Sequence, residues 1–179
     1  MIAALVVAFL AYEYARFRHV AERDDLTGLN NRRHFERALL SNIRNAERSG
    51  TPFALFYMDL DGFKEVNDTY GHRVGDELLR AFARRLQDNV DHSDIVARLG
   101  GDEFGLIVTA ASEAQASSIA KRLTSLLSQP YALRRNVLEI GCSMGFSVHP
   151  TDGVSPSELV QAADQAMYRV KRAKVGVVG

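Results

Sequence analysis

The stretch FALFYMDLD, residues 53–61, restricts the fold of this chain more than any other. Its first six residues are apolar without alternation, which is typical of a strand covered on both faces. Such a strand needs packing partners on each side of its sheet, so the stretch predicts a central strand in a layered fold. It ends on Asp59 and Asp61, which the two-residue period of a strand places on one face.

The rest of the chain supplies helices and a hairpin for this strand. Apolar residues recur at helical spacing in four segments, which are predicted helices: one ending near Gly50, then 75–90, 114–126 and 159–170. Residues 94–99 and 104–109 predict a hairpin, and residues 140–146 a strand with one packed and one bare face. A hairpin between helix-connected strands predicts an α+β fold, with a mainly antiparallel central sheet flanked by helices.

The amino-acid composition restricts the partners that the chain is expected to bind. The 179 residues include 22 Lys and Arg against 22 Asp and Glu, so no long-range field attracts polyanions, and nucleic acid is disfavoured as a partner. Any bound phosphates must therefore be held by a few nearby backbone amides, lysines or metal ions. Cys142 is the only cysteine in the sequence, which excludes an internal disulfide and a cysteine-based metal cluster and fits a reducing cytosol.

The sequence divides into three parts: an apolar N-terminal segment at 1–23, the main domain at 24–175 and a short tail at 176–179. MIAALVVAFLAY, residues 1–12, is an uninterrupted apolar run with basic residues after it. A membrane-spanning helix needs about 20 apolar residues, so the run is short for one. Two interpretations stay open: part of a membrane-spanning helix with its basic flank on the cytoplasmic side, or a lead-in helix that packs on the domain or on a second copy. A secretory signal is disfavoured, because no basic segment precedes the run.

Three acidic residues stand where strands end. Asp59 closes the buried strand, and Asp102 and Glu103 follow Gly100 and Gly101 at the tip of the predicted hairpin. If the hairpin lies beside the central strand, the carboxylates converge and need positive charge. Oxygen ligands favour Mg²⁺ or Mn²⁺, and two such ions stabilise the attacking and leaving oxygens of a phosphoryl transfer. The glycines let a phosphate or nucleoside approach the backbone closely, although Gly-Gly-Asp-Glu by itself is more often a solvated turn.

Longer motifs favour the metal-site interpretation. RLGGDEF at 98–104 resembles the signature of the GGDEF family, the diguanylate cyclases. Three further stretches resemble motifs of that family in the same order: DDLTGLNNRRHF at 24–35, MDLDGFKEVNDTYGHRVGDELL at 58–79 and AADQAMYRVKRA at 162–173. The resemblance covers residues 24 to about 174 and implies a palm-like domain with a ferredoxin-like core.

The resemblance implies an enzyme that condenses two GTP molecules into cyclic di-GMP and releases two pyrophosphates. Each domain of a homodimer would hold one GTP and two Mg²⁺ or Mn²⁺ ions. Asp59 and Asp102 are the implied metal ligands, together with the backbone carbonyl of Leu60. Glu103 is implied as a further metal ligand or as the base for the ribose 3′ hydroxyl, and the two glycines of the signature belong to the same catalytic loop.

The resemblance also implies which residues bind the nucleotide. Asn67 and Asp76 are implied to read the guanine, and a carboxylate does accept from both guanine N1 and N2, whereas adenine presents the opposite pattern. Taken alone, both residues are more typical of helix ends. The phosphates are implied to bind the start of a short helix after the metal strand and the closing motif, at Gly62, Phe63, Lys64 and Lys171.

The chain departs from the family ahead of the signature. Family members with product inhibition carry Arg-x-x-Asp there, but this chain reads DHSD at 91–94. Asp94 is kept, while Asp91 replaces the arginine that would bind a product phosphate. An acid at this position repels the ligand, so high-affinity product inhibition is not expected there. The active half-site could still bind product, which carries the same guanine as the substrate.

Two other functions stay open. A degenerate domain would bind GTP or cyclic di-GMP as a sensor without turnover, and a polymerase palm or another nucleotide cyclase would use the same metal chemistry. The intact acids argue against the sensor, and Asn67 and Asp76 argue against other substrates. The domain is expected in the cytoplasm, free or attached to the inner face of the membrane. Residues 1–23 are the obvious element to align two domains face to face.

The closing motif departs as well and generates a prediction. It usually continues as Gly-Arg-Asn, but here Val175 stands where a phosphate-binding arginine is expected, with Arg172 and Lys174 as alternatives. We predict weak triphosphate binding, because a lysine lacks the bidentate fork of arginine. Val175→Arg should lower the Kd of a non-hydrolysable GTP analogue about tenfold, as one charge-assisted hydrogen bond would. Calorimetric titration measures this, and an unchanged Kd would contradict it.

Overall fold

The computed structural model describes residues 22–109, 111–133 and 136–175, so the predicted N-terminal helix and the tail 176–179 lie outside the described residues. Within those ranges no helix is long and apolar enough to cross a membrane. The elements are β1 (Asn30–Asn31), α2 (Arg32–Ser49), β2 (Phe53–Asp61), α3 (Phe63–Tyr70), α4 (His72–Gln87), β3 (Ile95–Gly100), β4 (Glu103–Thr109), α5 (Glu113–Leu127), β5 (Tyr131–Leu133), β6 (Asn136–Leu138), β7 (Gly141–His149) and α6 (Pro156–Val175).

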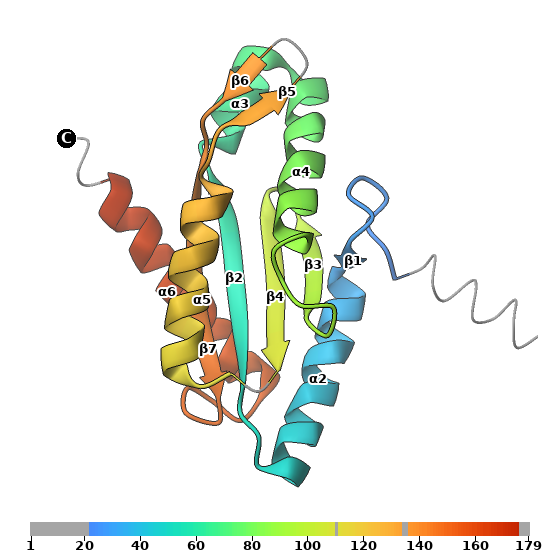
Figure 1. The fold of residues 1–179 in the computed structure, drawn as a ribbon, viewed down its shortest axis with the longest axis vertical. Coiled ribbons are helices and arrows are strands. Elements are labelled where there is room, and N and C mark those ends of the chain that lie inside the picture. Colours follow the sequence, from blue (N-terminus) through green and yellow to red (C-terminus); the bar gives the residue numbers. More distant parts are fainter. Residues whose placement is uncertain (1–21, 110, 134–135, 176–179) are drawn as a thin grey trace, which may run out of the picture.

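Five strands form one sheet in the order β1-β3-β4-β2-β7 (Figure 1). β2 is antiparallel to both of its neighbours, β4 and β7, and β3 is antiparallel to β4. The two-residue strand β1 pairs in parallel with β3. The prediction of an α+β fold with a mainly antiparallel sheet is therefore confirmed.

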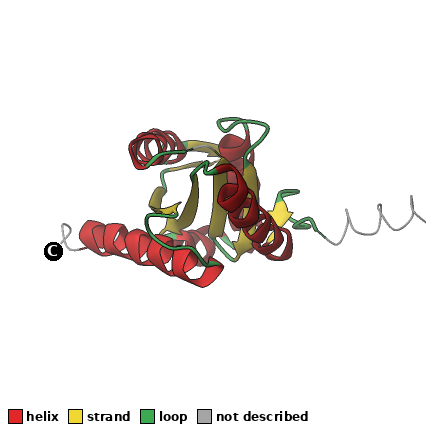
Figure 2. Cartoon of the chain, turned by 90° about the horizontal axis from the view of Figure 1, so that it is seen from below, coloured by secondary structure: helices red, strands yellow, loops and turns green. Residues whose placement is uncertain are grey.

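Helices cover both faces of the sheet, as the unbroken apolar run of β2 requires (Figure 2). On one face Phe56 and Met58 pack in a core with residues of α4 and α5. On the other face Leu55 and Tyr57 pack with residues of α2 and α6. The first six residues of β2 are buried, so the interpretation of the run as a strand covered on both faces is confirmed.

The strand predicted to have one packed and one bare face is β7. The prediction of a bare face is wrong, because α6 covers that face. A Cβ placed on Gly145 would lie 2.0 Å from the backbone nitrogen of Met167 and 2.3 Å from the carbonyl oxygen of Ala163. The backbone of α6 therefore packs directly on this strand. Ser147 strengthens the contact by donating to the carbonyl of Leu159 at 2.8 Å. The small residues of β7 allow close helix packing and do not mark exposure to solvent.

Two further details differ from the sequence analysis. The helix predicted to begin at Gly75 begins at His72, directly after Gly71, whose φ is 82°. The short helix expected after the metal strand is α3, which ends before Gly71. A small hairpin of β5 and β6 was not predicted and lies at one end of the molecule (Figure 1). It is tied to α4 by Arg85, whose guanidinium lies 3.6 Å from the ring centroid of Tyr131.

His149, the last residue of β7, generates a stability prediction. Its side chain is only 5% exposed and stacks on Phe53 at 5.2 Å, but neither ring nitrogen has a hydrogen-bond partner in the part of the chain that the structure describes. A buried polar atom without a partner costs about 1–3 kcal/mol. His149→Phe keeps the stacked ring and removes both nitrogens, so we expect the free energy of unfolding to rise by about 1 kcal/mol.

Urea denaturation measures this change, with His92→Phe on an exposed loop as the control that should give no gain. A loss of stability in His149→Phe would show that the ring nitrogens are satisfied in solution.

Candidate active site

The tip of the β3–β4 hairpin lies beside the end of β2. Asp59 stands directly opposite Glu103 in the antiparallel register, and the backbone nitrogen of Leu60 donates to the carbonyl of Asp102 at 3.4 Å. Gly100 and Gly101 make the turn with φ values of 146° and 53°, which side chains rarely tolerate. The structure thus brings the three predicted acids to one end of the sheet.

Asp59 and Asp102 interact electrostatically. Burial raises the pKa of Asp102 above its ordinary value, and the negative charge of Asp59 raises it further, while Lys171 and Arg98 oppose the shift in part. Two neighbouring carboxylates repel each other when both are ionised, so a bound cation would stabilise the ionised form of both. This pair is the electrostatic centre of the candidate site.

Lys171 of α6 reaches the same acids from the other side. Its Nζ donates to Oδ1 of Asp59 at 2.6 Å. Partial burial works against its charge, but the hydrogen bond to Asp59, with the further negative charges of Asp102 and Asp61, raises the pKa of Lys171 above its ordinary value. Lys171 is therefore a charged group of the site and not a solvated helix residue.

Glu103 is held by α2. Nη2 of Arg32 lies 3.2 Å from Oε2 of Glu103, and Nε of Arg32 donates to the carbonyl of Leu99 at 2.8 Å. Both side chains of the ion pair are partly exposed, at 49% and 43%, so the pair contributes little to stability and acts mainly on orientation. Sequence reasoning missed Arg32, although it lies in the opening motif at 24–35.

Arg98 braces the turn in the same way. Its Nε and Nη2 donate to the carbonyl of Gly101 at 3.0 and 2.8 Å, and its Nη1 lies 3.2 Å from both carboxylate oxygens of Asp24. Asp24 also accepts from the backbone nitrogen and the hydroxyl of Thr27, at 2.9 and 2.6 Å. The opening motif therefore fixes the shape of the glycine turn, a role that the spacing of the sequence did not indicate.

The two predicted guanine-binding residues lie on neighbouring helices, Asn67 on α3 and Asp76 on α4. Gly75 of α4 lies against Asn67 of α3. A Cβ on Gly75 would lie 2.0 Å from Oδ1 of Asn67 and 3.3 Å from Cζ of Phe63. The absence of a side chain at Gly75 lets the amide of Asn67 pack against α4 at the residue that precedes Asp76. Nearby, Gly62 has a φ of 78° and precedes α3, with Lys64 exposed in the first turn.

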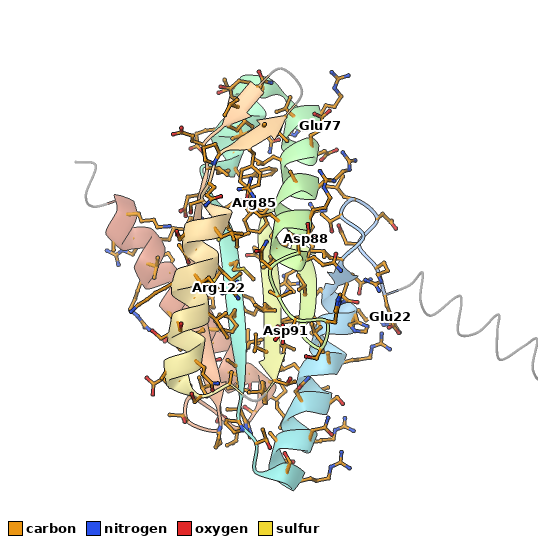
Figure 3. The ribbon with its side chains drawn as sticks, viewed as in Figure 1. Glu22, Glu77, Arg85, Asp88, Asp91 and Arg122 are labelled. Atoms are coloured by element: carbon orange, nitrogen blue, oxygen red, sulfur yellow. The ribbon has the colours of Figure 1, made fainter. Side chains whose placement is uncertain are left out.

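The position expected to bind product in inhibited relatives is acidic here. The backbone nitrogen of Asp91 donates to Oδ2 of Asp94 at 3.0 Å, and burial followed by the charge of Asp91 raises the pKa of Asp94. Figure 3 shows Asp91 on the loop between α4 and β3. The two acids share a hollow of about 190 Å³ with Arg23, Asn30 and His92. The absence of product inhibition at this position stays a prediction.

The acidic side chains of the site do not by themselves form a complete metal site. They fit a cation only if a bound ligand supplies further oxygen atoms. Among the described residues no group of three or more His, Cys, Asp or Glu side chains is arranged to hold a metal ion. Mg²⁺ is commonly held by one or two carboxylates, with substrate phosphates and water completing its shell. Asp59 and Asp102 with the nearby carbonyl of Leu60 match that smaller donor set. The predicted Mg²⁺ or Mn²⁺ ions stay a prediction.

Comparison with known proteins decides the family. The family model described as diguanylate cyclase, GGDEF domain, matches residues 21–176. The chain belongs to the GGDEF family. A relative from Pseudomonas aeruginosa, the bifunctional diguanylate cyclase/cyclic di-GMP phosphodiesterase MucR, is 45% identical over 152 residues, which are 85% of this chain and 22% of MucR. The chain spans about a fifth of the length of the curated relatives that match it first.

Solved structures of GGDEF proteins share the fold. A sensory box/GGDEF family protein from Caulobacter crescentus superposes with a TM-score of 0.80 at 42% identity, covering 85% of this chain and 99% of that one. The coiled coil and GGDEF domain of DgcB from the same organism, in complex with c-di-GMP, superposes with a TM-score of 0.84 at 28% identity, covering 96% and 91%.

The contact between Gly75 and Asn67 generates a prediction for base recognition. Gly75→Ala should displace the flexible amide of Asn67, while the added methyl group favours the helix by about 1 kcal/mol. We therefore expect the Kd of a non-hydrolysable GTP analogue to rise at least about tenfold with little change in Tm. Arg73→Ala, on the exposed face of the same helix, is the control. Unchanged GTP affinity in Gly75→Ala would exclude Asn67 from base recognition.

Proposed function

We propose that this GGDEF domain is a diguanylate cyclase, which condenses two GTP molecules into cyclic di-GMP with release of two pyrophosphates. The observation that carries the proposal is the cluster at the end of β2, where Asp59 pairs with Glu103 on the neighbouring strand and where burial, followed by the charge of Asp59, raises the pKa of Asp102. Relatives named as diguanylate cyclases support the activity, and the complex of DgcB with c-di-GMP supports the product.

In the proposed site Asp59 and Asp102, with the carbonyl of Leu60, would hold Mg²⁺ or Mn²⁺, which when bound would supply positive charge to the phosphate oxygens. Lys171, which already lies 2.6 Å from Asp59, adds positive charge from α6 beside the terminal phosphates. The amides at the start of α3, after Gly62, bind the same phosphates, and Asn67 with Asp76 holds the guanine.

The bond changes need a second domain. The ribose 3′ oxygen of a GTP held by one domain attacks the α-phosphorus of the GTP held by its partner, the bond from that phosphorus to the bridging oxygen of the β-phosphate breaks, and pyrophosphate leaves. The reciprocal attack by the second 3′ oxygen closes the ring and releases the second pyrophosphate. Glu103, whose carboxylate is held by Arg32, serves in this proposal either as a further metal ligand or as the base that takes the 3′ hydroxyl proton. Catalysis then depends mainly on position and electrostatics.

We propose a homodimer aligned by residues 1–23, in the cytoplasm or attached to the inner face of the membrane.

A sensor that binds GTP or cyclic di-GMP without turnover is the second candidate. The altered closing motif favours it, because Val175 replaces the expected arginine. The three acids at the end of β2 favour the cyclase, since a sensor has no use for two carboxylates held at an electrostatic cost.

Turnover distinguishes the two candidates. The full chain, incubated with GTP and Mg²⁺ or Mn²⁺, should form cyclic di-GMP and pyrophosphate, measured by liquid chromatography with mass spectrometry. Asp102→Ala removes one of the two carboxylates and should lower kcat at least about 100-fold, because loss of a group that only orients a metal ligand already costs about 10-fold to 100-fold. Nucleotide binding without product in the unaltered chain would favour the sensor, and turnover of ATP in a nucleotide panel would contradict guanine recognition.

A further inference from the structure

A second lysine of α6 reaches the sheet one turn after Lys171. Nζ of Lys174 lies 2.7 Å from Oδ2 of Asp61 and 2.8 Å from the carbonyl oxygen of Cys142. Asp61 also accepts from the hydroxyl of Ser143 at 2.5 Å. Lys174 therefore joins the last turn of α6 to the end of β2 and to the start of β7 at once.

The two lysines match the two aspartates in spacing. Lys171 and Lys174 are three residues apart on a helix, so their side chains lie on one face. Asp59 and Asp61 are two residues apart on a strand, so they also share a face. Each lysine pairs with one aspartate, at 2.6 and 2.7 Å. A shift of α6 along β2 by one helical residue would break both ion pairs, so together they fix the helix in position.

The second ion pair is a feature of this chain and not of the usual closing motif. That motif has glycine where Lys174 stands, and a glycine has no side chain to reach Asp61. Direct phosphate binding by Lys174 is also disfavoured, because its ammonium already has two acceptors in the folded chain. The neighbouring Arg172 is directed elsewhere, with its guanidinium 5.9 Å from the ring centroid of Tyr168.

We propose that Lys174 is a positioning residue, which holds the last turn of α6 against β2 and β7 and thereby keeps Lys171 beside Asp59. The contact compensates in part for the missing arginine, because a fixed Lys171 binds phosphate with a smaller loss of conformational entropy. The proposal rests on the proposed function only in giving Lys171 a phosphate to bind. The position of α6 is independent of turnover.

The contact acts locally. The Lys174 side chain is 42% exposed, and ion pairs at that exposure contribute little to global stability. The middle of α6 is fixed separately by its close packing on Gly145. Loss of Lys174 should therefore loosen the last turn of the helix and leave the fold intact, so a variant lacking it remains measurable.

Hydrogen exchange of the full chain without nucleotide tests the contact, with mass spectrometry of peptides that cover 168–175. In Lys174→Met the amides of the last turn should exchange about fivefold faster than in the unaltered chain, since local opening controls exchange there. Arg172→Met removes the same charge from the same turn and should leave exchange unchanged. Lys174→Arg retains donors for both acceptors and should restore protection. Equal exchange in Lys174→Met and the unaltered chain, or an equal increase in Arg172→Met, would overturn the proposal.

Steady-state kinetics test the consequence for Lys171. Lys174→Met should raise the KM for GTP about threefold to tenfold with a smaller change in kcat, and Lys174→Arg should reverse the increase. An unchanged KM beside faster exchange would show that the contact does not serve Lys171. If the unaltered chain forms no product, the proposed cyclase activity fails, while the exchange measurement still decides whether Lys174 holds α6.

Discussion

The candidate site depends on one electrostatic constraint: Asp59 and the nearby Asp61 stand at the end of a buried strand, β2. β2 is covered by helices on both faces, and Asp59 and Asp61 follow directly on its buried residues. Charges at the end of such a strand are partly removed from water and need compensation from the protein or from a ligand. The chain supplies two lysines from α6 at this point, and each meets one aspartate. The position of α6 is therefore tied to the chemistry of the site.

The glycines of β7 make this arrangement possible. At Gly145 the backbone of α6 approaches to a distance that excludes any side chain on the strand, and at Gly141 a Cβ would lie 2.5 Å from Oδ2 of Asp61. The helix thus lies close enough to β2 for lysines to span the remaining gap. The same principle operates at Gly75, where a missing side chain admits Asn67. At Gly141 and Gly75 the sequence therefore has glycine where the side chain of Asp61 or Asn67 must fit, and at Gly145 it has glycine where a helix backbone must fit.

The sequence predicted the parts of the fold that follow from periodicity. The unbroken run in β2, the hairpin across Gly100 and Gly101 and the helices with regular apolar spacing needed only local pattern. The hairpin β5–β6 was missed because strands of three residues are too short to show a period. The bare face of β7 was wrong because small residues look alike in sequence whether water or a helix backbone covers them. Of the site, the acids and their convergence were predictable, since they stand at strand ends.

The contacts between distant motifs were not predictable in this way. Arg32 and Arg98 hold the acidic turn through acceptors 67 and 3 residues away, and a partner for a long basic side chain is fixed by the tertiary fold and not by spacing. Arg98 shows the reason clearly, because it donates to Gly101 within its own hairpin and to Asp24 in the opening motif. A resemblance of motifs indicates that these residues belong to one site but not which atoms meet.

The ion pairs also shape how the proposed substrate would bind. In the free chain the ammonium of Lys171 compensates Asp59, so nucleotide and metal do not enter a bare cluster of negative charge. Binding would exchange partners: the cation takes over Asp59 while Lys171 turns to phosphate, and the number of unpaired charges in the site stays low throughout. Each exchange replaces one attractive pair with another, so little electrostatic free energy is lost when the ligands bind. Affinity for GTP and affinity for metal should consequently be coupled through Lys171, because neither ligand alone provides a new partner for both groups of the ion pair.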